Sequence, residues 1–324
     1  MSTQRLIGLF CAAAGAAAAT ALAARHTSAA SAPAAPGARG LTSRRAPRLP
    51  RGSPESAHIA AARSFNRGST LLALSVLADS AMEHYRGSFD NPAMYTPLVS
   101  ATLSLLAGLH GGGDSRAEKH RIRHAVYLGT ALAGVSGTAF HLYNITKRPG
   151  GWSWNNLFHA APVGAPMALL LSGALGAAAE RLRDEPAVDP QLFGMPAGRA
   201  LGLLVAIGLA GTVAEAGLLH FRGAFQHRAM YAPVTLPPIA AALLVHAALA
   251  PPRERWITRA WLRVTAALGF IGAGFHVRGI ARRRGGWRNW SQNLFDGPPV
   301  PAPPSFSGLA LAGLAALRLR ETEK

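Results

Sequence analysis

Six of the twelve histidines in this chain form three pairs whose members are separated by 135 or 136 residues. The pairs are His84/His220, His110/His246 and His141/His276. Imidazole nitrogens bind haem iron and metal ions, so histidines that recur at one interval are candidates for such a site. Cysteine-based metal sites and disulfides within the chain are excluded, because Cys11 is the sole cysteine.

The first and third histidine pairs end apolar runs, which suits bis-histidine ligation of b-type haem. In an up-down bundle, the first and third helices are diagonal, so their histidines would approach each other at similar depth. Nearby arginines would bind haem propionates through charge-assisted hydrogen bonds. The predicted cofactor-binding residues are His84, His141, His220, His276, Arg86 and Arg222, with Tyr95 and Tyr231 nearby. A small metal ion held by histidine and carboxylate is equally compatible, and capping of helix ends is the structural alternative.

A fourth pairing is acidic, since Asp79 matches Glu215 at the same interval. Both lie within apolar runs, where an ionisable group is costly and therefore a functional candidate, for example in a small-solute or proton-coupled carrier. A structural interpretation is equally open. Arg86 and Arg222 follow seven residues later on the same helix face, so each carboxylate could pair with its arginine.

Two longer segments repeat in the same order. HYRGSFDNPAMYTP (84–97) aligns without gaps on HFRGAFQHRAMYAP (220–233), with eight identities in fourteen positions. FHLYNITKRPGGWSWNNLFHAAPVGAP (140–166) matches FHVRGIARRRGGWRNWSQNLFDGPPVPAP (275–303) with small insertions. Two matched blocks at one interval indicate an internal duplication.

Eight apolar runs are long enough, at roughly 20 residues, to cross a bilayer as helices. They lie at about 69–86, 93–110, 124–145, 160–179, 201–221, 229–250, 260–278 and 300–317. The predicted fold is all-α: a polytopic membrane protein with two tandem four-helix transmembrane repeats in parallel orientation. It has eight transmembrane helices and a possible extra N-terminal helix.

The chain divides accordingly. Residues 1–24 are predicted to be a signal peptide or N-terminal membrane anchor, residues 25–67 a disordered basic tail, and residues 185–200 a linker. The first four-helix repeat covers 68–184 and the second covers 201–324. The histidines outside the pairs that we expect to be solvated are His26, His58, His120 and His124.

Because each repeat has an even number of helices, the matched blocks of both repeats fall on one membrane side. We call this side the motif end; it is formed by 87–92, 146–159, 222–228 and 279–299. The other side holds more Lys and Arg, so the positive-inside rule places the motif end outside the cytoplasm. A cleaved signal peptide would put the basic tail outside and contradict this, so the orientation is open. Glycine pairs in the second block predict tight turns, followed by irregular starts of the fourth helices.

Composition limits the function classes. Only 15% of residues are charged and 49% are hydrophobic, and the basic residues behind the net charge of +18 lie in short loops, so nucleic-acid binding is excluded. No P-loop, dinucleotide fingerprint, HExxH or GxSxG motif is present, and whether the protein is an enzyme is left undecided.

Three hypotheses follow. The first is a haem- or metal-binding protein for electron transfer, the second a carrier that uses Asp79 and Glu215, and the third a non-catalytic membrane subunit or assembly factor. The predicted location is a membrane, the bacterial inner membrane, with lipid and a redox or other protein as partners.

Overall fold

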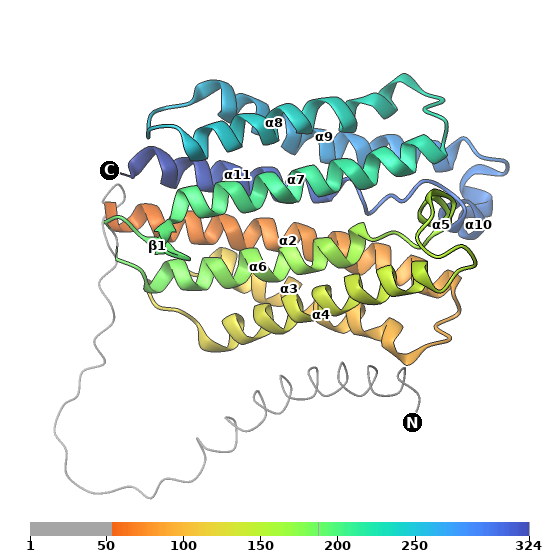
Figure 1. Ribbon diagram of the computed structural model, residues 1–324, viewed down its shortest axis with the longest axis horizontal. Coiled ribbons are helices and arrows are strands. Elements are labelled where there is room, and N and C mark those ends of the chain that lie inside the picture. The colour runs from red at the N-terminus through yellow and green to blue at the C-terminus, as the bar shows by residue number, and fades with distance from the viewer. Residues whose placement is uncertain (1–53, 187, 324) are drawn as a thin grey trace, which may run out of the picture.

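Eight long helices lie side by side along the longest axis of the molecule in the computed structural model, which describes residues 54–186 and 188–323 (Figure 1). They are α2 (Pro54–Arg86), α3 (Thr96–Gly113), α4 (Arg121–Thr146), α6 (Gly164–Asp184), α7 (Ala197–Arg222), α8 (Ala232–Leu249), α9 (Trp256–Ala281) and α11 (Pro304–Thr322). The described part of the chain is therefore helical, as predicted.

Shorter elements connect these helices. The 3-10 helices η1 (Pro92–Tyr95) and η2 (Arg228–Tyr231) lead into α3 and α8. The short helices α5 (Trp154–His159) and α10 (Trp290–Phe295) precede α6 and α11, with a third 3-10 helix, η3 (Gly286–Asn289), before α10. In the linker, β1 (Gln191–Leu192) and β2 (Met195–Pro196) form one antiparallel pair.

The prediction of a disordered tail over 25–67 is wrong for its last part, because α2 already begins at Pro54. Phe65 and Asn66 are fully buried, so this segment is held by packing. His58, which we expected to be solvated, is only 4% exposed for the same reason. The predicted segment 1–24 and the tail up to residue 53 lie outside the described residues. Each of the eight apolar runs overlaps one long helix.

The long helices pack in two groups with the same pairings. In the first group, α2 and α4 each contact α3 and α6, so α2 and α4 are diagonal. In the second group, α7 and α9 each contact α8 and α11, so α7 and α9 are diagonal. The groups meet where α2 packs on α11 and α6 on α7, which puts these four helices at the centre (Figure 1).

Small residues allow the central helices to approach closely. A Cβ atom added to Gly68 of α2 would lie 2.7 Å from the carbonyl oxygen of Gly308 of α11, so the two backbones are in direct contact there. The surrounding core is Ala- and Leu-rich, as at Leu72, Ala312 and Leu309. Close backbone approach at small residues is typical of helix packing in membranes.

Five helical segments among the described residues are long and apolar enough to cross a membrane: Pro92–Gly113, Arg121–Thr146, Ala197–Arg222, Arg228–Leu249 and Trp256–Ala281. Their apolar side chains face outward: Leu132, Ile207 and Phe270 are 64%, 69% and 59% exposed. A soluble monomer rarely exposes so much apolar surface, and lipid would cover it. These segments indicate a multi-pass membrane protein.

Candidate functional site

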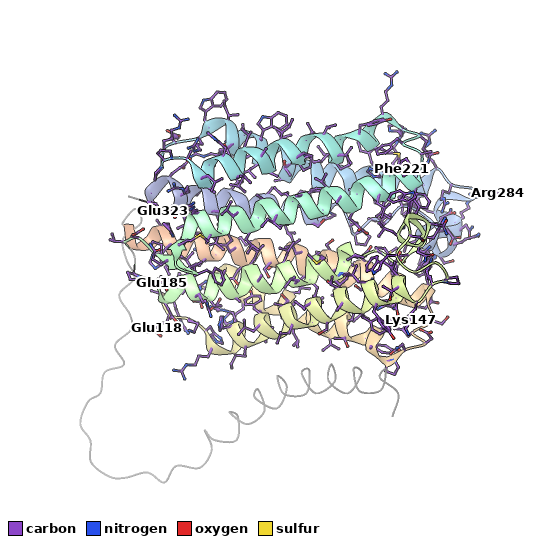
Figure 2. All side chains as sticks on the ribbon, in the orientation of Figure 1. Glu118, Lys147, Glu185, Phe221, Arg284 and Glu323 are labelled. Atoms are coloured by element: carbon purple, nitrogen blue, oxygen red, sulfur yellow. The ribbon has the colours of Figure 1, made fainter. Side chains whose placement is uncertain are left out.

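The segments of the motif end gather at one end of the helices. Figure 2 labels Lys147, Phe221 and Arg284 there, and Glu118 and Glu323 at the opposite end. Each short helix crosses to the other group. Phe158 of α5 contacts Phe221 at the end of α7, and Phe295 of α10 stacks on Tyr85 at the end of α2, with ring centroids 4.9 Å apart.

Glycine pairs and asparagines shape these crossings. The predicted tight turns are confirmed, since Gly150, Gly151, Gly285 and Gly286 all have positive φ. Asn156 Nδ2 donates to the carbonyl oxygens of Pro149 and Gly151, and Asn293 Nδ2 donates to those of Arg284 and Gly286. Both asparagines are 5% exposed, so each is a buried brace for the loop before it.

All four predicted ligand histidines bind a backbone carbonyl through Nδ1. His84 Nδ1 lies 2.6 Å from the oxygen of Met94, and His220 Nδ1 lies 2.9 Å from that of Met230, the corresponding residue of the repeated block. His141 and His276 bind the carbonyls of Pro162 and Pro299, each at 2.7 Å, just before α6 and α11. The same bond is therefore made at corresponding places in the two groups.

These hydrogen bonds fix the tautomer. A carbonyl oxygen only accepts, so Nδ1 carries the proton in all four rings and, in the neutral imidazole, Nε2 carries the lone pair. No hydrogen bond between described residues uses Nε2 of any of the four. Such a histidine, with Nδ1 oriented by a carbonyl and Nε2 free, has the arrangement usual for metal-ligating imidazoles.

The histidines also come together in the predicted combinations. His84 of α2 and His141 of α4 are close enough for their charges to interact, and so are His220 of α7 and His276 of α9. The third pair does not join them. His110 and His246 are exposed near the opposite end of the bundle, where the His110 ring lies 5.4 Å from that of His120.

An aromatic stack supports the first histidine of each group. Phe89 lies edge-on to His84 and stacks on Tyr95, with ring centroids 6.2 and 4.6 Å apart. Phe225 contacts His220 and Tyr231 at 6.1 and 4.7 Å. Phe89 and Phe225 have φ of 49° and 46°, a left-handed conformation that costs a non-glycine residue on the order of 1–3 kcal/mol. Tyr95 and Tyr231 thus lie near the histidines as expected.

The two predicted arginines have other partners. Arg86 is exposed and pairs with Glu83 at 2.7 Å, not with Asp79. Arg222 is half-buried; its Nη2 donates to the carbonyl oxygens of Leu157 and Ala160 at 3.2 and 3.3 Å, where α5 ends. Arg222 therefore ties α5 to α7.

The carboxylates of Asp79 in α2 and Glu215 in α7 lie close enough, across the boundary between the two groups of helices, for their charges to interact. Glu215 packs against Gly164 at the start of α6, where a Cβ on this glycine would be 2.6 Å from Glu215 Cγ. The backbone N–H of Gly164 lies beside the Glu215 carboxyl, whose Oε1 is buried without a hydrogen-bond partner among the described residues. Two acidic side chains thus approach each other between the two groups.

One buried cluster was not predicted. Glu180 of α6 is fully buried, and both of its oxygens accept hydrogen bonds at 2.9 Å from Arg123 of α4. Asn66 of α2 and the backbone N–H of His120 also donate to it. Arg123 further binds Asp114 at 2.7 Å. This cluster joins α2, α4 and α6 at the end opposite to the motif end.

Sequence reasoning missed this cluster because its buried carboxylate has no acidic counterpart at the matched position of the second group. The insertions in the second matched block lengthen the interval to 137 residues, at which Glu180 corresponds to Leu317. The comparison of the two repeats therefore does not pair Glu180 with another acidic residue. The feature of the sequence that could have revealed this cluster is the group of polar residues at the end of the fourth apolar run.

His120, which we expected to be solvated, is instead the half-buried N-cap of α4. Burial opposes ionisation of Asp114, but the hydrogen bond from Arg123 and neighbouring positive charge hold the pKa of Asp114 below its ordinary value.

The described residues bring no three His, Cys, Asp or Glu side chains together in a way that could hold a metal ion. Ligation of haem iron by two histidines needs no third protein ligand, so this finding bears on a small metal ion only. No family model, curated protein or solved structure matches this chain.

Proposed function

We propose that this is a membrane protein of two tandem four-helix repeats in parallel orientation, and that each repeat binds one b-type haem for electron transfer. The repeat is supported by the matched sequence blocks, the equal helix pairings and the same histidine-to-carbonyl bonds in both groups. The eight helices would all cross the membrane, with α2, α6 and α11 largely surrounded by protein. The bacterial inner membrane stays a prediction.

The haem proposal rests on the hydrogen bonding and the placement of the four histidine side chains. Each is oriented by a carbonyl through Nδ1, has no hydrogen bond from a described residue at Nε2, and lies near its partner on the diagonal helix. In this proposal His84 and His141 ligate one haem, and His220 and His276 the other. A bound haem would supply one-electron chemistry, and the protein would supply the two histidines that hold it and an apolar surround.

The remaining predicted residues have roles that follow from their places. Tyr95 and Tyr231 would brace the first histidine of each site through Phe89 and Phe225. Arg86, exposed beside Glu83, and Arg222 stay the proposed propionate partners. A quinone or a protein would donate or accept the electron.

Absorption spectroscopy tests the proposal. Protein purified from haem-replete cells should have a Soret band corresponding to two haems per chain. His84→Ala or His141→Ala should remove about half of this absorbance, because each affects one site only. Combining His84→Ala with His220→Ala should remove nearly all of it. His110→Ala, in an exposed histidine at the other end, is the matched control and should change nothing. A colourless wild-type protein would refute haem binding.

A second candidate function is a carrier whose site lies between the two groups. The specific observation is the approach of Asp79 to Glu215 across the boundary between the groups, with Glu215 Oε1 buried and unpartnered among the described residues. Paired intramembrane carboxylates suit a proton or a cationic solute. Uptake into proteoliposomes should then be lost in the Asp79→Asn, Glu215→Gln double variant, and transport that survives this change would exclude the site.

A further inference from the structure

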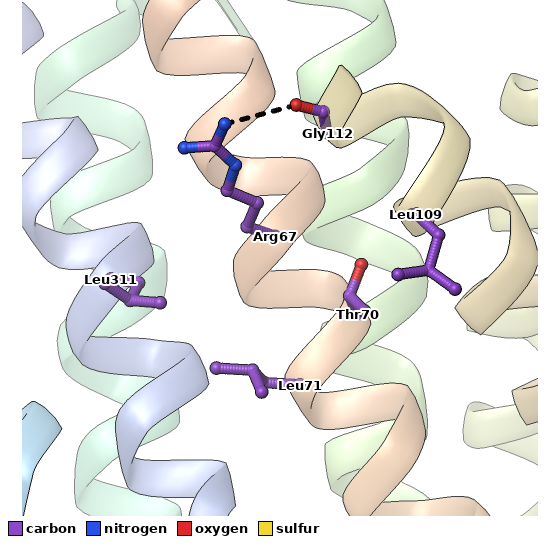
Figure 3. Close-up of a pocket in the computed structure, with 7 residues that line it drawn as sticks. Arg67, Thr70, Leu71, Leu109, Gly112 and Leu311 are labelled. Atoms are coloured by element: carbon purple, nitrogen blue, oxygen red, sulfur yellow. Dashed lines mark hydrogen bonds between the residues drawn. The ribbon is translucent and has the colours of Figure 1, made fainter. Parts of the chain in front are cut away.

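A groove lies along the seam between α2 and α11, close to the opposite end from the motif end (Figure 3). It has a volume of about 360 Å³, and its walls are formed by Arg67, Thr70, Leu71, Leu109 and Leu311, with glycines of α3. A second groove of about 180 Å³ continues along the same seam and shares Arg67 and Leu311 with the first. It adds Arg318 of α11. None of the predicted site residues lines either groove.

The sequence explains why the groove is open. α2 and α11 are held together deeper in the seam by the backbone contact of Gly68 with Gly308. The end of α3 that faces α2 carries Gly108 and Gly112, so no side chains fill the space there. A Cβ on Gly112 would lie 3.2 Å from Arg67 Cγ, which places the arginine stem directly over the α3 backbone.

The rim of the groove is cationic. Arg67 and Arg318 are exposed, and Arg63, one turn before Arg67, is half-buried. None of these three arginines forms an ion pair with any described residue. Nη2 of Arg67 donates to the carbonyl oxygen of Gly112 at 3.4 Å (Figure 3). Nε of Arg63 donates to the same oxygen at 3.2 Å. The bond from Arg67 holds its guanidinium at the end of α3 and leaves its other N–H groups for an external anion.

The charged side chains of the groove lie nearer the end of the bundle than its apolar side chains, which matches the head group and acyl chains of a lipid. Arg67 lies level with Gly112, the last turn of α3, and Arg318 lies in the last turns of α11, so both belong to the membrane–water boundary. Leu71 and Leu109 come about one turn further into the bundle than Arg67 and Gly112, and Leu311 comes about two turns further in than Arg318. A phosphate at the rim and a hydrocarbon chain below it would match this arrangement.

We infer that this groove binds an anionic phospholipid, with its phosphate between Arg67 and Arg318 and an acyl chain along the three leucines. The lipid would seal the seam between the two groups of helices. The inference depends on the membrane location proposed above and not on haem. It agrees with the predicted orientation, because this end has the excess of basic residues and anionic lipid is concentrated on the cytoplasmic side.

Native mass spectrometry of the detergent-solubilised full chain tests the inference, with phosphatidylglycerol and phosphatidylcholine added in turn. Wild-type protein should retain phosphatidylglycerol at about tenfold lower lipid concentration than phosphatidylcholine. Both lipids carry a phosphate, but the choline ammonium cancels its charge in phosphatidylcholine, and the attraction of an anionic lipid is worth about 1 kcal/mol per nearby arginine. Arg67→Ala or Arg318→Ala should abolish this preference, and Arg67→Lys should keep most of it. Arg121→Ala, in an exposed arginine at the same end but outside the groove, should leave it intact.

A second variant separates the apolar contact from the charge. Leu109→Trp fills the groove and should weaken binding of both lipids, while circular dichroism checks that the helices are retained. Equal binding of the two lipids by wild-type protein would overturn the inference, and so would an unchanged preference in both arginine variants. Displacement of phosphatidylglycerol by millimolar inorganic phosphate would show a simple anion site instead. A protein that is soluble without detergent would refute the membrane location itself.

Discussion

Glu180 receives hydrogen bonds from Arg123, Asn66 and the backbone of His120, three parts of the chain that are distant in sequence. Its carboxylate is fully removed from solvent, and such a charge is tolerated only when its hydrogen-bonding capacity is filled. Arg183 completes the arrangement by donating to the carbonyl oxygens of Gly111, Asp114 and Arg116. These side chains fix the loop between α3 and α4 to the end of α6.

Removal of this carboxylate should therefore destabilise the first group of helices. Glu180→Gln leaves Arg123 buried with Asp114 as its only acidic partner among the described residues, and loss of one member of a buried pair costs about 3–5 kcal/mol. We expect a clear fall in the thermal unfolding temperature in detergent, measured by circular dichroism. Glu118→Gln, in an exposed residue of the same end, is the control. An unchanged temperature in Glu180→Gln would mean that the ion pair adds nothing to stability.

At the scale of elements, glycines determine how closely helices pack. α4 and α6 are in extensive contact, and a Cβ on Gly134 of α4 would lie 2.3 Å from the backbone nitrogen of Leu170 in α6. Gly173 of α6 meets the backbone of Ala131 in the same way, at 2.4 Å. By contrast, Gly129 of α4 has nothing within 4 Å of its Cβ position. One helix thus carries both a packing glycine and a free one.

Alanine substitution should distinguish these two glycines. Gly134→Ala forces α4 and α6 apart, because the obstructing atoms are backbone, and should lower the unfolding temperature. Gly129→Ala should leave it unchanged or raise it, since alanine favours a helix by about 1 kcal/mol over glycine. Thermal unfolding of the two variants in one detergent measures the difference. If both variants behaved alike, the α4–α6 packing described above would be incorrect.

At the scale of the whole molecule, the apolar surface and the helix order together define how the chain would cross a membrane. The loops after α2, α4, α7 and α9 lie at one end, and the loops before α4 and α9 lie at the other. This arrangement puts both matched blocks at the same end of the bundle. In the proposed fold, the even number of helices in each repeat would place that end in one compartment.

Cysteine accessibility in intact cells or sealed vesicles tests this topology. In a Cys11→Ser background, Asp90→Cys and Gln226→Cys should react with a membrane-impermeant maleimide from the same side, and Glu118→Cys and Glu254→Cys from the other. All four positions are exposed, so failure to react reports sidedness and not burial. Labelling of Asp90→Cys and Gln226→Cys from opposite sides would contradict the parallel arrangement. Positive-inside counting places the first two outside the cytoplasm.

The sequence by itself was enough to predict a helical protein and the approximate positions of the long helices, except that α2 begins at Pro54 and not near residue 69. The length of a hydrophobic run is a local, linear property of the chain, and a bilayer imposes it on a helix directly. The glycine turns at Gly150 and Gly285 were predictable for the same reason, because only the local backbone is involved.

Tertiary structure alone decided which polar groups meet. The sequence suggested Arg86 as a partner for Asp79, but the ion pair forms with Glu83, because the nearer carboxylate reaches it at 2.7 Å. Glu180 with Arg123, and Asp79 with Glu215, come together only through the packing of α4 on α6 and of one helix group on the other. Helix periodicity predicts which side chains share a face of one helix. Contacts between helices depend instead on the rotation and depth of each helix in the bundle. Those are set by the sum of many small packing contacts that no short segment of sequence contains.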